Sequence, residues 1–438
     1  MIGGAGNILA NQPKSLRLCE RVFQLRRTLL DTYLIVKDRF LDRVRLSVLW
    51  RLIPGAGKMI RRISLLFALM FAIALYPGVS ARAQLPADEM TSKTLPEASQ
   101  NWAFVLDAGF PATTVAKLDI IDGSTRKMQG QLSGGYLSNF VLAPNHREMY
   151  MVDTYYARGW RGARTDVVSI FDAKTLNFVA EVEIPPKRIL IVPKRDSSTI
   201  TADGRFILVA NMTPATSVSV VDLKERKFVG EIDTPGCVQA IAAGNRQFSS
   251  MCADGSILTV QLDDSGKAKD RKQGKPFFDP GKDPVFDQPA IVGAKAYFDT
   301  YHGAIHVVDM SGPDATFESE WSILGNDESA KSWRPGGWQT IAVNEKNHLA
   351  FVLMHQGGEW THKELGSEVW VLDTAKKTRV SRIKLKTPAY SINVSQGDSP
   401  TLYCLSLIKS QVEEYAAGDG KFLGAVGQLG TPFLVYTP

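Results

Sequence analysis

The chain has 438 residues, of which 44% are hydrophobic and 22% charged, with 36 Gly, 22 Pro and 4 Cys. This composition excludes a disordered chain, a collagen-like repeat and a disulfide-dense mini-protein, because there is enough apolar material for a large core. The formal charge of +6 comes from the front of the chain: residues 1–83 hold 14 Lys and Arg against 4 Asp and Glu, which leaves 37 and 41 in the rest. The remainder is mildly acidic, and this argues against nucleic-acid binding.

The first segment, residues 1–58, is rich in arginine with leucines between, as in Leu25-Arg-Arg-Thr-Leu-Leu30. Taken alone, such a pattern is typical of a basic amphipathic helix on a membrane surface. A secretory signal normally begins at the translation start, and Met59 stands where such a start would be. We therefore interpret residues 1–58 as an extension produced by an overcalled start site.

Residues 59–83 have the three parts of a secretory signal peptide. Met59-Ile-Arg-Arg is the basic start, the 14-residue run 63–76 is uncharged and apolar, and Ala81-Arg-Ala83 is a small-residue cleavage site. The apolar run is shorter than the ~20 residues that a membrane-spanning helix needs. The sequence therefore predicts cleavage after Ala83 and export to the periplasm, with an uncleaved membrane anchor as the alternative.

Residues 84–100 are predicted to be a linker, and residues 101–438 have almost entirely the pattern of β-strands. Runs of β-branched and aromatic residues are separated by Gly, Asp, Asn and Pro, and no long amphipathic helix is predicted. One unit recurs: an alternating strand ends in an acidic turn, and a second strand follows. The seven turn residues are Asp122, Asp172, Asp222, Asp263, Asp309, Asp373 and Asp419.

The intervals between these aspartates are 50, 50, 41, 46, 64 and 46 residues. A second landmark interleaves with the first: a polar turn leads into an apolar strand, as in the segments 202–210 and 344–352. Two hairpins per period of about 45 residues make a four-stranded antiparallel unit, which is the blade of a β-propeller. The sequence therefore predicts an all-β fold, a seven-bladed propeller, with an insertion around residues 321–338 in the longest interval.

The cysteines agree with export. Cys19 is lost with the leader, and Cys237 and Cys252 are 15 residues apart, a spacing that suits two strand ends meeting across a hairpin. In an oxidising compartment such a pair is expected to form a disulfide. Cys404, inside an apolar strand, is predicted to be a buried free thiol.

No catalytic or metal-binding pattern is apparent in residues 101–438. There is no Cys-x-x-Cys-His haem site, no G-x-S-x-G elbow and no phosphate-binding loop. His355, Glu359 and His362 would have metal-ligand spacing on a helix, but Gly357-Gly358 favours a hairpin there. Gly134-Gly135 and Gly336-Gly337 are interpreted as turn glycines. We therefore expect no metal and no catalytic residue on this chain.

Several segments nevertheless resemble one family, the heavy chains of the quinoprotein amine dehydrogenases, which comprise methylamine dehydrogenase and aromatic amine dehydrogenase. The resemblance runs from about residue 100 to the C-terminus, and Cys237 and Cys252 stand where the family has an intrachain disulfide. The matching segments are Gly134–Asn139, Arg161–Val168, Pro185–Arg188, Pro214–Ser217, Trp333–Gln339, Thr361–Lys363 and Ser391–Gln396.

The resemblance implies a seven-bladed propeller that assembles in the periplasm as two heavy and two light chains. The light chain carries tryptophan tryptophylquinone and the catalytic aspartate, and the heavy chain has no cofactor of its own. A primary amine is oxidised to an aldehyde and ammonia, and electrons pass to a blue-copper protein of the amicyanin or azurin type. The absence of catalytic groups on this chain fits that division of labour.

One residue of this chain is expected near the chemistry. The family places an aromatic residue of the Gly-Gly-aromatic-Leu segment near the substrate entrance, and Tyr136 is the matching position, where methylamine dehydrogenase usually has Phe. The alternative is that Tyr136 is only an interface residue at a blade end.

The amine itself is not fixed by the resemblance. Trp333–Gln339 and Ser391–Gln396 look like methylamine dehydrogenase, whereas Pro185–Arg188 and the strand that ends at Asp373 look closer to the aromatic enzyme. We favour methylamine or another short primary amine. The competing interpretation is a non-catalytic periplasmic propeller that only binds a protein partner.

Overall fold

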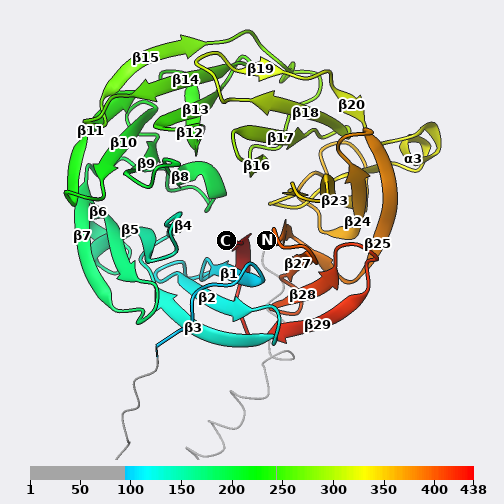
Figure 1. Ribbon diagram of the computed structural model, residues 1–438, viewed down its shortest axis with the longest axis horizontal. Helices are drawn as coiled ribbons and strands as arrows, with labels where there is room; N and C mark the ends of the chain where they lie inside the picture. Colours follow the sequence, from blue (N-terminus) through cyan, green and yellow to red (C-terminus); the bar gives the residue numbers. More distant parts are fainter. Residues whose placement is uncertain (1–93, 243) are drawn as a thin grey trace, which may run out of the picture. The chain divides into compact units, whose positions relative to one another are not determined.

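The computed structural model describes residues 94–438 except residue 243. These residues form seven antiparallel sheets around a central axis (Figure 1). This confirms the predicted seven-bladed propeller. The predicted extension and signal peptide, residues 1–83, lie outside the described residues. No helix in the described part of the chain has the length and apolar character needed to cross a membrane.

Each blade occupies about one seventh of the ring, and its strands succeed one another from the centre outward. Blade 1 is β30 (Pro432–Tyr436), β1 (Trp102–Asp107), β2 (Lys117–Asp122) and β3 (Lys127–Ser133). Blade 2 is β4 (Asn139–Leu142), β5 (Glu148–Arg158), β6 (Arg161–Asp172) and β7 (Phe178–Ile184). Blade 3 is β8 (Ser198–Ile200), β9 (Phe206–Asn211), β10 (Ser217–Asp222) and β11 (Lys227–Asp233), preceded by the 3-10 turn η1 (Arg195–Ser197).

The remaining blades follow the same order. Blade 4 is β12 (Cys237–Ala242), β13 (Gln247–Cys252), β14 (Ile257–Leu262) and β15 (Ala268–Gln273). Blade 5 is β16 (Ala290–Val292), β17 (Lys295–Asp299), β18 (Ala304–Asp309) and, both on β18, β19 (Thr316–Phe317) and β20 (Trp321–Ser322). Blade 6 is β21 (Trp333–Pro335) and β22 (Ile341–Asn344), both on β23 (Leu349–Gln356), then β24 (Gly366–Asp373) and β25 (Thr378–Ala389). Blade 7 is β26 (Ser391–Val394), β27 (Thr401–Ser406), β28 (Gln411–Ala416) and β29 (Phe422–Gly427).

The recurring aspartates have one structural task. Each closes the hairpin between the third and fourth strands of its blade by accepting a backbone N–H from two or three residues further on. In blade 2, for example, Asp172 accepts from Lys174 at 3.0 Å and from Thr175 at 2.7 Å. A short carboxylate side chain favours such turns because it can replace a backbone acceptor. The sequence period is therefore the period of this turn.

The core consists of seven apolar clusters, one between each pair of neighbouring blades. The middle strands of a blade are therefore buried on both faces, as in β9 and β10, where all residues are buried. The outermost strands are half-buried, as in β11, or exposed, as in β15. A single blade leaves two apolar faces uncovered, so the ring is stable only when every blade has two neighbours. Cys404 is a buried free thiol in the cluster between blades 6 and 7, as predicted.

The ring is closed by the first and the last strand of the propeller. The C-terminal strand β30 pairs with β1 as the innermost strand of blade 1, and the red C-terminal end lies at the centre of the ring beside β1 (Figure 1). The long 64-residue interval contains β20, the short helix α3 (Asn326–Ala330) and β21, and α3 projects from the rim (Figure 1). The insertion predicted around residues 321–338 is thus present.

Candidate functional site

One side of the ring carries the segments that resemble the amine dehydrogenase heavy chains. Because the strands of a blade alternate in direction, the links between blades and the hairpins between second and third strands emerge on the same side. We call this side the loop face, and the side with the seven turn aspartates the turn face. Six of the seven matching segments include loop-face residues, and the seventh is β26 with the two residues that follow it.

Tyr136 lies on the loop face, in the link between β3 and β4. The link is residues 134–138, which we call the Tyr136 loop. The Tyr136 ring is half-buried and meets the ring of Tyr156 edge to face, with centroids 5.8 Å apart. The tyrosine backbone N–H donates to the carbonyl oxygen of Thr154 at 2.8 Å. The loop therefore lies along the inner side of the β5–β6 hairpin.

The two glycines of the Tyr136 loop are needed for close packing. A Cβ on Gly135 would lie 2.5 Å from the carbonyl oxygen of Thr154, and a Cβ on Gly134 would lie 2.8 Å from Oδ1 of Asp153. Neither glycine has a left-handed φ angle. The two glycines come directly before the turn at residues 136–137, and the side chains and backbone of the next hairpin leave no space for a Cβ at either position.

A buried polar network supports this loop from below. The carboxylate of Asp153 accepts hydrogen bonds from the Gly135 N–H at 2.9 Å, from Oγ of Ser138 at 2.5 Å and from Oγ of Ser169 at 2.7 Å. Beside it, the guanidinium of Arg188 donates to the carbonyl oxygens of Tyr136 and Leu137. Burial lowers the pKa of Arg188 to about 10, opposed by the nearby carboxylates. The side chain remains a cation at any physiological pH.

The β5–β6 hairpin extends beyond its blade. β4 pairs with β5 only up to Val152, and β7 pairs with β6 only from Asp166, whereas β5 and β6 continue to pair as far as Arg158 and Arg161. Trp160, at the tip of this ribbon, is 66% exposed. A two-stranded ribbon is only marginally stable in water, and a bare indole at its tip is typical of a binding surface. The ribbon is not predicted from the sequence, although the strand pattern of β5 is unusually long.

The distribution of exposed apolar side chains separates the two sides of the ring. Twelve large apolar residues are exposed in the described part of the chain. Six lie on the outermost strands β3, β7, β19, β25 and β29. The other six lie on the loop face and are Val115, Tyr155, Trp160, Ile191, Trp360 and Ile408. None of the twelve lies in a turn-face connection, so the loop face is the better candidate for binding a protein.

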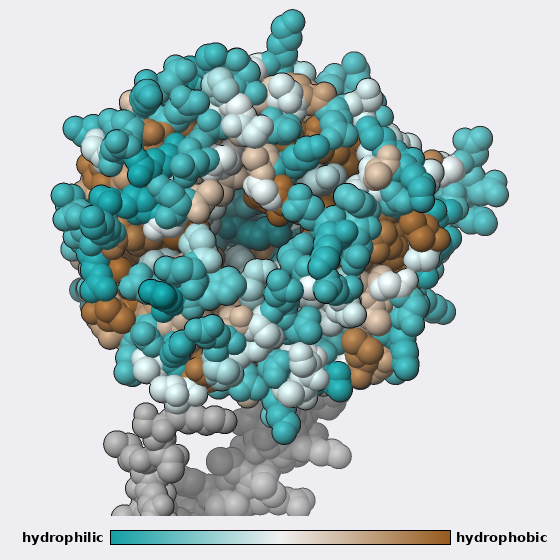
Figure 2. Space-filling model, in the orientation of Figure 1, coloured by the Kyte–Doolittle hydropathy of each residue, from teal (hydrophilic) through white to brown (hydrophobic). Residues whose placement is uncertain are grey.

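The loop face also carries a groove, which we call the aromatic groove. It has a volume of about 410 Å³ and is lined by residues that include Phe278, Phe286, Tyr301, Trp338, His362 and Lys363. The rings of Tyr301 and His362 stack at 4.1 Å, and Lys363 lies over the Trp338 ring at 6.0 Å. Burial, with a smaller effect of Lys363, lowers the pKa of His362, so this imidazole is neutral at pH 7. Figure 2 shows one side of the ring, on which mostly hydrophilic residues surround a central hollow.

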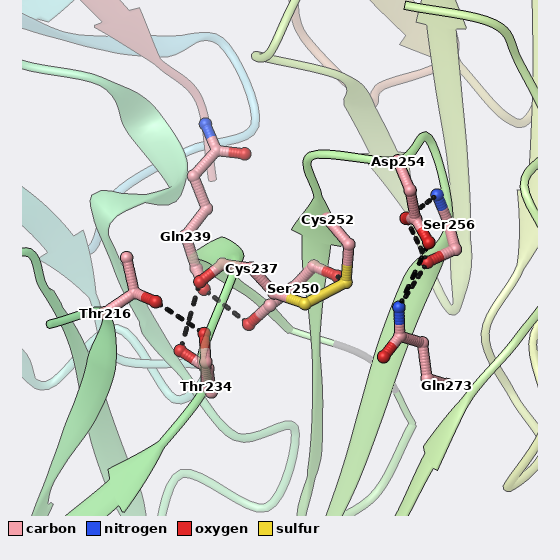
Figure 3. Close-up of a disulfide and its surroundings, with 9 residues drawn as sticks. All are labelled: Thr216, Thr234, Cys237, Gln239, Ser250, Cys252, Asp254, Ser256 and Gln273. Carbon is pink, nitrogen blue, oxygen red and sulfur yellow. Dashed lines mark hydrogen bonds between the residues drawn. A yellow bond between two sulfur atoms is a disulfide. The ribbon is translucent and has the colours of Figure 1, made fainter.

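The Cys237–Cys252 disulfide lies at the edge of this groove. The two cysteines stand opposite each other on β12 and β13 and are bonded, as their spacing predicts (Figure 3). Cys252 is among the groove residues. Nearby, Thr234 Oγ1 donates to the carbonyl oxygen of Cys237 at 3.1 Å. The bridge fixes the ends of two strands that form one wall of the groove.

The link between β7 and β8, residues 185–197, joins these features across the centre of the ring. The carbonyl oxygen of Lys194 accepts a hydrogen bond from Nδ2 of Asn139 at 2.8 Å, beside the Tyr136 loop. The adjacent carbonyl of Pro193 accepts from the Trp338 indole N–H at 2.9 Å, in the aromatic groove. Blade 2 and blade 6 are thus tied together over the central axis. The segment was noted in the sequence only for its resemblance at residues 185–188.

The described residues contain no group of three or more His, Cys, Asp or Glu side chains that could hold a metal ion. His355 lies at the end of β23 and His362 in the link between β23 and β24, so the segment is not a helix, in agreement with the expectation from Gly357-Gly358. Nε2 of His355 is 2.9 Å from Oγ1 of Thr361, so this imidazole stabilises the link.

Comparison with known proteins identifies relatives over almost all of the described chain. The family model of the methylamine dehydrogenase heavy chain matches residues 100–437. The methylamine dehydrogenase heavy chain of Methylophilus methylotrophus is 31% identical over 353 residues, 80% of this chain and 86% of that one. The heavy chain of Paracoccus versutus is 32% identical over 348 residues, 78% of this chain and 80% of that one.

Two solved structures are similar in fold alone. Dihydro-heme d1 dehydrogenase NirN has a TM-score of 0.51 at 15% identity, and the superposition covers 80% of this chain and 77% of that one. A functionally unknown protein from Desulfotomaculum acetoxidans DSM 771 has a TM-score of 0.53 at 13% identity, and the superposition covers 77% of this chain and 98% of that one. At this level of identity, the similarity shows a propeller and no shared activity.

Proposed function

Because the chain belongs to the methylamine dehydrogenase heavy chain family, we propose that it is the heavy subunit of a periplasmic amine dehydrogenase. The complex oxidises primary amines, with methylamine favoured, to an aldehyde and ammonia. Two heavy and two light chains assemble, and electrons pass to a blue-copper protein of the amicyanin or azurin type. The contribution of this chain is to bind the light chain and to shape the substrate entrance.

The observation that carries the proposal is the shared location of the family segments and the exposed indoles. The Tyr136 loop, the ribbon with Trp160 and the link with Trp360 all belong to the loop face. Large aromatic residues dominate the energetics of protein interfaces because they bury much area with little loss of side-chain entropy. The light chain therefore binds on the loop face.

Trp333 and Trp370, the tryptophans that pack together in the described part of the chain, do not fit the role of a quinone precursor. Trp333 and Trp370 pack with ring centroids 5.5 Å apart, but both are buried between blades 5 and 6, and the Arg382 guanidinium lies 4.6 Å from the Trp333 ring. We therefore assign tryptophan tryptophylquinone to the light chain. The quinone, where it is present, supplies the oxidation of the amine. Tyr136 contributes by restricting access, since its half-buried ring stands at the loop face.

Native mass spectrometry of the complex from its own host tests the assembly. We expect two heavy and two light chains, with a quinone absorption band that belongs to the light chain. A heavy chain that is recovered alone, under conditions where the light chain is present, would support the non-catalytic binding protein instead.

The same preparation tests the periplasmic location. The disulfide is consistent with an oxidising compartment, and cleavage after Ala83 would leave Gln84 at the N-terminus. The mass of the purified heavy chain should therefore correspond to residues 84–438. A mass that includes residues 1–58 would contradict both the signal peptide and the start at Met59.

The docking face is tested with surface variants. Trp160→Ala and Trp360→Ala should each weaken association with the light chain by about tenfold or more, the usual effect of removing a central indole. The matched control is Phe178→Ala, an exposed ring on the outermost strand β7. Equal effects of all three variants, or none in the first two, would rule out the loop face as the docking surface.

A further inference from the structure

Arg188 makes a set of contacts that its position in the sequence does not suggest. Its side chain is only 2% exposed and lies beneath the Tyr136 loop. Its Nη2 donates to the carbonyl oxygens of Tyr136 at 2.6 Å and of Leu137 at 2.9 Å. Its Nε donates to Oγ1 of Thr154 at 2.7 Å. One guanidinium thus joins two consecutive carbonyls of the loop to the neighbouring hairpin.

The loop needs such support because its backbone is strained. Leu137 has a φ of 47°, in the left-handed region that residues with a side chain rarely adopt. Arg188 binds the carbonyl oxygens of the loop, and the N–H groups of Gly135 and Tyr136 donate to Asp153 and Thr154. Hydrogen bonds to the carbonyls and to the N–H groups together offset the cost of this conformation, so the loss of the bonds to the carbonyls should free the loop to relax.

The contacts of Arg188 are unlike those of a stabilising ion pair. Among the described residues, no carboxylate accepts a hydrogen bond from its guanidinium, and Asp166 is instead bound by Arg164 through bonds of 2.9 and 2.6 Å. Asp166 and Asp153 favour the charged form of Arg188 without accepting from its guanidinium, and even a buried ion pair contributes little to stability compared with apolar side chains of similar size. What a planar group with five donors provides is a fixed geometry, which a lysine cannot reproduce.

We propose that Arg188 is the positioning residue of the substrate entrance: it fixes the backbone of the Tyr136 loop, and thereby where the Tyr136 ring stands and which amines pass it. This inference rests on the proposed role of Tyr136 as the wall of that entrance. Arg188 itself touches neither substrate nor quinone and acts only through the loop.

Hydrogen exchange in the assembled complex tests the positioning directly. Arg188→Lys keeps the charge but loses the fork of donors, so the amides of Gly135 and Tyr136 should exchange about tenfold faster or more, as expected when hydrogen bonds to a charged donor are lost. The matched control is Arg205→Lys in blade 3, whose guanidinium binds Asp222 near the turn face. The control should leave exchange in the Tyr136 loop unchanged. Unchanged exchange in Arg188→Lys would overturn the proposal.

A second variant covers the case in which Arg188→Lys does not fold. Thr154→Val removes the hydroxyl that accepts from Nε of Arg188 and leaves the guanidinium in place. It should accelerate exchange in the Tyr136 loop in the same direction and by a smaller factor. If Thr154→Val leaves the loop amides protected as in the wild type, while Arg188→Lys does not fold, Arg188 is a residue of general stability and the proposal fails.

Selectivity separates this inference from the function on which it rests. The ratio of kcat/KM for methylamine to that for a bulkier amine should change in Arg188→Lys in the same direction as in Tyr136→Ala. The double variant should show no further change, because both act through one ring. Additive changes would contradict the proposal. If exchange accelerates but neither single variant alters the ratio, Arg188 positions the loop and the entrance role of Tyr136 is the part that is wrong.

Discussion

The ring of Tyr136 has one aromatic contact in the described part of the chain, with Tyr156, whereas its backbone is hydrogen-bonded on both sides. Removing the ring should therefore leave the loop in place and widen the entrance. We predict that Tyr136→Ala shifts kcat/KM from short toward bulkier amines by about tenfold, the scale of steric discrimination by one side chain. Steady-state kinetics over a series of primary amines measures the ratio.

Two further readouts distinguish access from assembly in this variant. Tyr136→Phe should behave as the wild type, because only the size of the ring matters for access. The quinone absorption and the tetramer should persist in Tyr136→Ala, since no catalytic group is removed. Weaker light-chain association with an unchanged ratio of kcat/KM values would show that Tyr136 is an interface residue.

Asp299 gives the propeller a pH-dependent stability. The carboxyl is fully buried at the end of β17, its Oδ1 is 3.0 Å from Oγ1 of Thr340, and burial raises its pKa to about 7. A folded-state pKa above the unfolded value of 3.8 favours the folded state at low pH. The stabilisation that Asp299 gives to the folded state is complete below pH 4. It declines as the pH rises to about 7 and is absent at higher pH. The total change is about 4 kcal/mol by the linkage relation.

Asp299→Asn should remove this share of the pH dependence. Free energies of unfolding from denaturant titrations at pH 5, 6, 7 and 8 should fall less steeply in the variant than in the wild type. The free energy of unfolding of the variant will still fall with rising pH, because burial also raises the pKa of Asp196 to about 6 and that of Glu414 to about 8. Asp264→Asn, at a side chain that is 99% exposed, is the control with an unchanged profile. Parallel profiles for Asp299→Asn and wild type would show that Asp299 is charged in the folded state.

At the scale of single elements, the sequence predicted the features that are formed by residues close together in the chain. Asp172 was identified by its spacing because the turn that it closes involves only the next few residues. The contacts of Arg188 span 34 to 52 residues, and an arginine in a loop is usually exposed. No local pattern distinguishes such a buried arginine, so only the resemblance at residues 185–188 drew attention to it. The aromatic groove was missed for the same reason, since three blades supply its walls.

The hairpin of β12 and β13 allows a test of its disulfide. Replacing Cys237 and Cys252 by Ala should lower the free energy of unfolding by about 3 kcal/mol on the loop-entropy model, because the bridge closes a separation of 15 residues. Chemical denaturation under non-reducing conditions measures the difference. In the unreduced, denatured mature protein, thiol labelling should modify Cys404 alone. Labelling of three cysteines would mean that the bridge does not form in the native host.

At the scale of the whole molecule, the sequence predicted the number of blades but not how the ring closes. The number of blades follows from seven similar turns. Closure of the ring, however, depends on the pairing of β30 with β1, which lies more than 300 residues away. Short β-strands at the two ends of a chain carry no signal of their mutual pairing. The strand is also tied to its neighbours: Ser391 Oγ donates to the Phe433 carbonyl at 2.7 Å, and Gln339 Nε2 to that of Val435 at 3.0 Å.

Removing the closing strand should therefore affect the entire ring. A chain that ends at Gly430 lacks β30, which exposes the inner edge of β1 and the apolar clusters on both sides of blade 1. We expect early proteolytic cleavage in blade 1 and loss of a single cooperative unfolding transition. Removal of Thr437 and Pro438 alone is the control and should unfold as the wild type does. A shortened chain that keeps one cooperative transition would show that six complete blades suffice.

The same closure determines when the protein can fold. β1 is the first strand of the propeller along the chain, and its inner partner β30 follows it by more than 300 residues. Blade 1 can therefore be completed only after the strands of the six other blades have been synthesised. The blade that begins first is completed last, so the native ring forms as one unit and not by adding finished blades one after another.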